Sequence, residues 1–222
     1  MISIAIDGPS GAGKSTVAKI LSKELNINYL DTGAMYRALG LYCYEHGYDV
    51  NDVNLINSII NDVEVNVDYI DNLQHTYLGD RDVSIEIRQH HISKLASDVS
   101  KNHKVRDRMA EMQRSIANKF NIVLDGRDIG SFVLPNATIK FYLTASSLVR
   151  AKRRQLELKE RGEEKDLLEL QKEIEDRDYN DSHRDYAPLI CCNDAIYLDT
   201  SNLSVDEVIN KIKEYLKDRK II

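Results

Sequence analysis

The sequence has no tryptophan and is poor in phenylalanine, proline and cysteine, with three of each among its 222 residues. The three cysteines, Cys43, Cys191 and Cys192, show no metal-ligand spacing, which favours a reduced, intracellular setting. No apolar run approaches the roughly 20 residues that a membrane-spanning helix needs. The first predicted strand starts at residue 2, so we expect no signal peptide.

Basic residues are also not in excess, because 30 Lys and Arg stand against 36 Asp and Glu, for a net charge of −6. Bulk charge therefore gives no argument for a nucleic-acid partner, and any basic site must be local. A hydrophobic content of 42% and a charged content of 30% are ordinary for a globular protein. A chain of this length is one large domain or a core with small insertions.

What the sequence does contain is a glycine-rich loop, Gly-Pro-Ser-Gly-Ala-Gly-Lys-Ser at residues 8–15, which fits the pattern Gly-x4-Gly-Lys-Ser/Thr. A β-branched run precedes it, and apolar residues at helical spacing follow it. In that context the loop N–H groups and the helix N-terminus cradle phosphates. Lys14 would supply a cation to the β- and γ-phosphates and Ser15 a hydroxyl to Mg²⁺. We expect the donor nucleotide to contact Gly8, Pro9, Ser10, Gly11, Ala12, Gly13, Lys14, Ser15 and Thr16.

Further along the chain, predicted strands alternate with predicted helices, which indicates a parallel α/β sheet with helices on both faces. The strands are expected at 27–31, 121–125, 138–143 and 195–198, and helices at 33–46, 51–60, 88–100, 103–118, 166–181 and 205–216. Thr32 is the expected cap of the helix at 33–46. In the helix at 103–118 a buried stripe of Val105, Met109, Met112 and Ile116 is expected, with Arg106 and Arg114 off it.

The stretch from 61 to 87 changes to a period of two residues. Alternating runs at 63–67, 73–78 and 83–87 predict a small three-stranded antiparallel unit. Three short strands are only marginally stable alone. We therefore interpret this unit as an insertion that leans on the main body.

Arginine and aspartate gather where catalysis is expected. Asp125, Arg127 and Asp128 follow a buried strand, and ligands of open α/β sheets bind at the carboxyl ends of strands. Arg37 near a strand–helix junction is as consistent with a phosphate ligand as with a solvated residue. Arg150, Arg153, Arg154 and Arg161 share one side of a helix, as in a mobile lid or a solvated face. Arg177, Asp181 and Arg184 share another face, which a salt-bridge ladder also explains.

So many arginines cannot all serve one triphosphate in a glycine loop, so a second phosphorylated ligand is indicated. An acceptor that is itself a phosphate is a dianionic nucleophile at pH 7 and needs no general base. Catalysis would then consist of positioning and charge neutralisation.

Four segments together resemble the bacterial cytidylate kinases along nearly the whole chain. They are Ile6-Asp7-Gly8-Pro9-Ser10-Gly11-Ala12-Gly13-Lys14-Ser15-Thr16, Asp31-Thr32-Gly33-Ala34-Met35-Tyr36-Arg37, Asp125-Gly126-Arg127-Asp128-Ile129-Gly130 and Arg177-Asp178-x2-Asp181-x2-Arg184. The resemblance implies transfer of the ATP γ-phosphoryl group to CMP or dCMP with Mg²⁺. It also implies a five-stranded parallel core, a nucleotide-binding insertion at about 61–87 and a helical lid at about 148–165. The core would then comprise residues 1–60, 88–145 and 190–222 of a single domain.

The resemblance further implies roles for individual residues. Arg37, Arg127 and Arg184 would hold the acceptor phosphate, Ser97, Arg106 and Asp128 the cytosine, and Arg177 and Asp181 the ribose. Thr32, Tyr36 and Asp125 belong to the same expected substrate site. The expected catalytic cations are Lys14, Arg127, Arg150, Arg153 and Arg154. Thr32 stands where some relatives carry Ser, and Ser15 where some carry Gly.

Two other kinds of acceptor stay open, and a nucleotide-dependent switch or binding module is a third alternative. The acceptor could be another monophosphate, such as UMP or AMP. A metabolite kinase with a hydroxyl acceptor would need a carboxylate base, and Asp31 or Asp125 could serve. A guanine-specific switch would carry Asn-Lys-x-Asp, which neither Asn-Lys pair provides. Taken together, we expect a cytoplasmic monomer that binds ATP, Mg²⁺ and CMP or dCMP, with no nucleic-acid or membrane partner.

Overall fold

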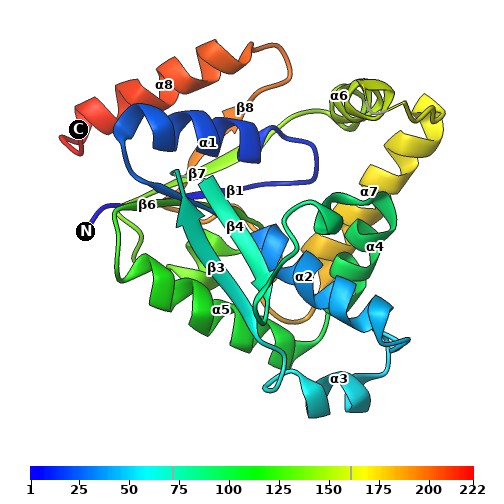
Figure 1. The fold of residues 1–222 in the computed structure, drawn as a ribbon. Coiled ribbons are helices and arrows are strands. Elements are labelled where there is room, and N and C mark those ends of the chain that lie inside the picture. Colours follow the sequence, from blue (N-terminus) through cyan, green and yellow to red (C-terminus); the bar gives the residue numbers. More distant parts are fainter. Residues whose placement is uncertain (72, 161) are drawn as a thin grey trace. The chain divides into compact units, whose positions relative to one another are not determined.

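The computed structural model in Figure 1 describes residues 1–71, 73–160 and 162–222. Arg161, expected on the basic helix face, lies outside the described residues. The chain divides into two compact units, one of residues 1–27 and 121–222 and one of residues 28–120. Within the described ranges, no helix is long and apolar enough to cross a membrane.

The first unit carries most of the parallel sheet. Its strands are β1 (Ser3–Asp7), β6 (Ile122–Gly126), β7 (Ile139–Thr144) and β8 (Ile196–Asp199). Its helices are α1 (Lys14–Leu25), α6 (Ser147–Glu160), α7 (Leu167–His183) and α8 (Val205–Asp218), with one π-helical turn, η2 (Ile129–Val133). The sheet has five strands in the order β2-β6-β1-β7-β8, which confirms the predicted fold class.

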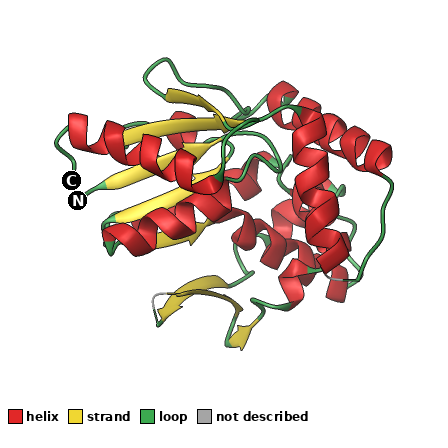
Figure 2. Ribbon diagram, turned by 90° about the horizontal axis from the view of Figure 1, so that it is seen from above, coloured by secondary structure: helices red, strands yellow, loops and turns green. Residues whose placement is uncertain are grey.

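The register of the sheet brings the expected functional segments to one edge. β1 pairs in parallel with β6 and β7, and Asp7 at its end lies opposite Gly126 and Tyr142. Ile4, Ala5 and Ile6 of β1 are fully buried, as expected for an inner strand of a parallel sheet. Figure 2 shows these strands side by side. The loops after β1 and β6 therefore leave the sheet at neighbouring positions.

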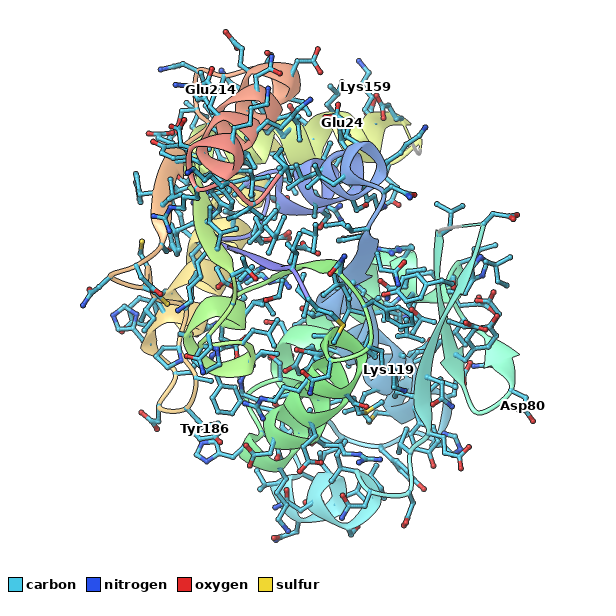
Figure 3. The ribbon with its side chains drawn as sticks, turned by 90° about the vertical axis from the view of Figure 1, so that its left-hand side faces the viewer. Glu24, Asp80, Lys119, Lys159, Tyr186 and Glu214 are labelled. Carbon is cyan, nitrogen blue, oxygen red and sulfur yellow. The ribbon has the colours of Figure 1, made fainter. Side chains whose placement is uncertain are left out.

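Two helix pairs complete this unit. α1 and α8 pack together, and Lys213 of α8 donates to Glu24 of α1 at 2.9 Å; Figure 3 labels Glu24 and Glu214 on this pair. α6 and α7 form a helical hairpin with a small apolar core of Ala151, Leu158, Leu170 and Ile174. The hairpin therefore has its own side-chain packing.

The second unit begins with β2 (Asn28–Asp31), which runs directly into α2 (Thr32–Glu45). The other helices are α3 (Val53–Ile59), η1 (Glu86–Arg88, one 3₁₀ turn), α4 (His90–Val99) and α5 (His103–Ala117). The strands β3 (Val65–Ile70), β4 (Leu73–Leu78) and β5 (Arg81–Asp82) form an antiparallel sheet in that order. The small antiparallel unit expected from the sequence is thus present.

Its third strand lies earlier than predicted. The expected run at 83–87 is not a strand; β5 is only Arg81–Asp82, and the chain then enters η1. Asp82 Oδ1 accepts the Ser84 N–H at 2.9 Å, a local turn that ends the pairing. Val83 and Ile87 are buried, but Ile85 is 84% exposed, so the alternation did not mark one buried face.

Two further expectations in this unit need correction. Asp31, not Thr32, caps α2, because its side chain accepts the Ala34 N–H at 3.0 Å and Thr32 is already helical. In α5, Val105 and Met109 are buried as expected, but Met112 and Ile116 are only partly so. Arg106, expected off the buried stripe, is only 2% exposed.

Candidate functional site

The glycine loop has the conformation that the motif requires. Gly8, Gly11 and Gly13 have φ of 146°, 74° and 87°, a region that side chains disfavour. A Cβ on Gly8 would lie 1.9 Å from the carbonyl oxygen of Leu143, so only glycine fits there. α1 begins at Lys14, and its free N-terminal N–H groups supply an anion site at the end of β1.

Lys14 is held inside this loop. Its Nζ donates to the carbonyl oxygen of Pro9 at 2.7 Å, and the side chain is buried. Burial, together with the guanidinium groups of Arg127 and Arg177, lowers the pKa of Lys14 well below its ordinary value. An entering phosphate would favour the charged ammonium, because opposite charges stabilise each other at short range. Lys14 is therefore suited to bind a polyphosphate.

The Ser15 hydroxyl at the end of the glycine loop lies beside the Asp125 carboxylate of β6. The Ser15 hydroxyl donates to Asp125 Oδ2 at 2.7 Å, and Asp125 at the end of β6 lies opposite Ile6 of β1. Magnesium prefers oxygen ligands, often one carboxylate with substrate phosphates and water. This donor pair fits Mg²⁺, with Ser15 and Asp125 as the groups that would hold it.

Asp7 is a buried carboxylate for which no role was predicted, although it lies within the first of the four segments that resemble cytidylate kinases. It accepts the N–H groups of Ile129 at 2.8 Å and Gly130 at 2.7 Å. Burial raises its pKa to about 6, against the lowering effect of these two hydrogen bonds. Asp7 thus fixes the backbone that follows Asp128 to the end of β1.

The expected substrate residues of the first unit come together beside that backbone. Arg127 Nε donates to Asp181 Oδ2 at 2.8 Å, and Arg184 lies 3.7 Å from Asp181 and 3.9 Å from Asp128. Burial favours neutral Asp181, but Arg127, Arg177 and Arg184 outweigh it and lower its pKa. Burial likewise opposes the charge of Arg127, yet Asp181 raises its pKa. Arg127 and Asp181 therefore stabilise each other's charged forms.

The basic face of α6 is divided in the structure. Arg150 is buried, and its Nε and Nη1 donate to the carbonyl oxygens of Ala145 at 2.8 Å and Ser10 at 2.9 Å. Its Nη1 also pairs with Asp178 of α7, whose other oxygen accepts the Ser10 N–H at 3.1 Å. The backbone N–H and carbonyl groups of Ser10 are thus hydrogen-bonded by Asp178 and Arg150, respectively. Asp178 is a motif position for which no role was predicted.

The other two arginines of this face are more exposed than Arg150. Arg153 donates from Nη2 to the carbonyl oxygen of Thr200 at 2.7 Å and from Nη1 to its hydroxyl at 3.1 Å. A Cβ on Gly13 would lie 3.9 Å from Arg153 Nη1, so this guanidinium lies beside the glycine loop. Arg154 pairs with Glu157 one turn away. Among the described arginines of this face, Arg150 and Arg153 are therefore the two whose contacts place them at the glycine loop.

The second unit gathers its own expected substrate residues at the start of α2 and in α5. Arg106 lies over the ring of Tyr36 at 5.6 Å and donates to the carbonyl oxygen of Ser100 at 3.1 Å. The Ser100 hydroxyl in turn donates to the carbonyl oxygen of Ser97 at 2.8 Å. The buried Thr32 begins α2, and Arg37 lies one turn further along it.

Asp31 is the anionic centre of this second group. Arg88 Nη1 donates to its Oδ2 at 2.9 Å, and Arg37 Nη1 lies 3.7 Å from the same atom. Burial alone would raise the pKa of Asp31, but Arg37 and Arg88 hold it below its ordinary value. A carboxylate held so strongly ionised is a weak proton acceptor. This environment argues against Asp31 as the base of a metabolite kinase.

The sequence of the chain matches a family of known proteins. The family model described as "Cytidylate kinase" matches residues 4–218. A cytidylate kinase of Caldicellulosiruptor bescii is 46% identical over 96% of this chain and 94% of its own, and one of Lactobacillus johnsonii is 45% identical over 99% and 95%. A shikimate kinase structure from Bacteroides thetaiotaomicron shares the fold at 12% identity, with a TM-score of 0.51 over 97% of this chain and 98% of that one. On this whole-length match, the chain belongs to the cytidylate kinase family.

Proposed function

We propose that this protein transfers the γ-phosphoryl group of ATP to CMP or dCMP, giving ADP and CDP or dCDP. The observation that carries the proposal is the match to the cytidylate kinase family over residues 4–218. The phosphate loop on β1 and the two arginine groups supply the charge that two phosphorylated substrates require.

On the donor side, residues 8–16 wrap the ATP phosphates, with Lys14 as the cation. The Ser15 hydroxyl and the Asp125 carboxylate would hold Mg²⁺, which would supply positive charge beside the transferring group. The 2.7 Å contact between Ser15 and Asp125 supports this assignment, because both oxygens are already on one side of the loop.

On the acceptor side, arginine binds phosphate and a carboxylate recognises the base. The CMP phosphate is bound by Arg37, Arg127 and Arg184. Cytosine is bound by Ser97, Arg106 and Asp128, and the ribose by Arg177 and Asp181, while the same substrate site also includes Thr32, Tyr36 and Asp125. Ion pairs already orient Arg127 and Arg184, so little conformational entropy is lost on binding. The domain roles proposed from the sequence are a core, a nucleotide-binding insertion at about 61–87 and a lid at about 148–165.

The chemistry needs no protein base. The dianionic acceptor phosphate attacks the γ-phosphorus, and the bond to the ADP oxygen breaks as the new P–O bond forms. Lys14, Arg127, Arg150, Arg153 and Arg154 neutralise the charge that develops. In this scheme Arg150 acts from its place against Ser10, where it also shapes the loop.

The cellular setting is part of the same proposal. We place the enzyme in the cytoplasm as a monomer that acts on free nucleotides, without a nucleic-acid or membrane partner. The free thiols of Cys43, Cys191 and Cys192 are those expected in a reducing compartment.

A coupled assay of ADP release across CMP, dCMP, UMP, AMP and shikimate tests the proposal. CMP and dCMP should give the highest kcat/KM, and omission of Mg²⁺ should abolish turnover. Preference for UMP or AMP would replace the substrate but keep the reaction class. Turnover with shikimate and none with CMP would overturn the proposal, because the acceptor would then be a hydroxyl.

A further inference from the structure

Two arginines of the second unit share one oxygen of one carboxylate, and they do so unequally. Arg88 Nη1 makes a 2.9 Å hydrogen bond to Asp31 Oδ2, whereas Arg37 Nη1 stops at 3.7 Å from the same atom. The second distance is an ion pair without a hydrogen bond. Arg88 therefore holds the position that Arg37 would otherwise take.

Asp31 cannot move to satisfy both arginines. Its Oδ1 accepts the Ala34 N–H at 3.0 Å, as the cap of α2. Its backbone N–H donates to Gln74 Oε1 at 2.6 Å, and its carbonyl oxygen accepts from Gln74 Nε2 at 3.3 Å. Gln74 belongs to β4, so the small antiparallel sheet holds the residue on which both arginines converge.

Arg37 has one buried hydrogen-bond donor, Nη1, that is available to a ligand. Its Nη1 is shielded from solvent and has no hydrogen-bond partner among the described residues. A Cβ on Gly33 would lie 3.6 Å from this atom and 3.2 Å from Asp31 Oδ1, so the guanidinium lies across Gly33. A buried donor without a partner is costly unless a ligand completes it. With one carboxylate and two guanidinium groups, the group also carries a net charge of about +1.

We propose that Arg88 is a positioning residue that occupies Asp31 and so keeps Arg37 available for the acceptor phosphate. Without Arg88, Arg37 moves across the 3.7 Å gap and hydrogen-bonds Asp31. Its Nη1 donor is then no longer available to the acceptor phosphate. Arg88 thus acts through Arg37 and does not touch the substrate. This inference rests on the proposed function, in which Arg37 binds the phosphate of CMP.

The central test compares Arg88→Met with the double variant Arg88→Met/Asp31→Asn. A gain of CMP affinity in the double variant would not be produced by a purely structural role of Arg88. Arg88→Met keeps most of the aliphatic stem, and folding should survive because the side chain is 43% exposed. We expect CMP binding by calorimetry to weaken about tenfold, the value of one charge-assisted hydrogen bond. ATP binding, kcat at saturating CMP and the melting temperature should stay near wild type, while KM for CMP rises.

Adding Asp31→Asn to Arg88→Met should restore most of the lost CMP affinity. Asparagine still caps α2 through its side-chain oxygen, but its neutral amide no longer captures Arg37. Arg88→Lys should also retain affinity, because an ammonium can occupy Asp31. Arg81→Met is the matched control, since it removes an exposed arginine, paired with Glu45 at 2.7 Å, from the same unit. It should leave CMP binding unchanged.

The possible results separate the two proposals. If Asp31→Asn fails to rescue Arg88→Met, Arg88 contacts the substrate itself and the positioning role is wrong. Unchanged CMP affinity in Arg88→Met also overturns it. A wild-type protein that binds no CMP would contradict the proposed function instead. The same set of variants, titrated with inorganic phosphate, would then decide on Arg88 alone.

Discussion

Asp7 accepts the N–H of Gly130 at 2.7 Å from the end of the neighbouring strand, and a Cβ on Gly130 would lie 3.2 Å from the accepting oxygen. Two segments more than a hundred residues apart in sequence thus meet through one buried carboxylate. Because Asp7 has a pKa of about 6, its protonation is linked to folding.

The first prediction concerns this linkage. The folded protein holds the proton of Asp7 up to about pH 6, whereas the unfolded chain loses it near pH 3.8. The stabilising contribution is therefore complete below about pH 4 and is lost as pH rises through about 6, by about 3 kcal/mol for a shift of this size. Urea unfolding of wild type and Asp7→Asn from pH 4.5 to 7.5 should show the difference in unfolding free energy, wild type minus variant, falling with pH. A constant difference would mean that Asp7 does not titrate in this range.

The second prediction concerns Lys14. Lys14→Ala should lower kcat by orders of magnitude and leave CMP affinity nearly unchanged, because the loop serves the donor phosphates. Steady-state kinetics measure the first effect and calorimetry the second. A comparable loss of CMP binding would assign the loop to the acceptor.

The third prediction concerns Arg153, which already lies beside the glycine loop. If its guanidinium acts on the transition state, Arg153→Ala should lower kcat more than it raises the KM of either substrate. Lys152→Ala, an exposed cation on the same helix, is the control and should change neither parameter. An unchanged kcat in Arg153→Ala would leave Arg153 as a residue that only anchors Thr200.

The fourth prediction concerns Asp128 and the choice of base. Cytosine presents an amine donor where uracil presents a carbonyl acceptor, and an ionised carboxylate can only accept. Asp128→Ala should lower kcat/KM for CMP by about ten- to a hundredfold, the value of a hydrogen bond to a charged group, while UMP loses much less. The ratio of kcat/KM for CMP and UMP is the measurement. Parallel losses would show that Asp128 instead orients Arg184, which lies 3.9 Å away.

Much of the fold follows from local sequence signals. The β-branched run before the glycine loop and the alternation of strands and helices predict the parallel sheet, since each signal lies within about ten residues. The third antiparallel strand was misplaced because one side-chain contact, Asp82 to Ser84, overrides the periodicity at 83–87. Asp31 and Thr32 are both good capping residues, so only the backbone conformation decides between them.

The functional groups divide in the same way. Motif residues such as Lys14 and Arg127 could be predicted as site residues because the spacing of their motifs is local and characteristic. Asp7, Asp178 and Arg88 were given no role in the sequence analysis, since each contacts a partner far along the chain: Asp7 contacts Gly130, Asp178 contacts Ser10 and Arg88 contacts Asp31. Their partners are set by the tertiary arrangement of strands, helices and loops, and no short sequence pattern encodes that arrangement.

The hydrogen bonds from Arg150 and Asp178 to Ser10 link movement of the α6–α7 hairpin to the glycine loop. The α6–α7 hairpin has its own apolar core, so a rotation of one of these helices would carry the other with it. A rotation that preserves the bonds to Ser10 would turn about that residue, and it would have to break the Arg153 bonds to Thr200 or carry Thr200 along. Displacement would then grow along α6, from Arg150 toward Glu160 at its far end. A small change at the glycine loop would therefore be accompanied by a larger displacement at the far end of α6.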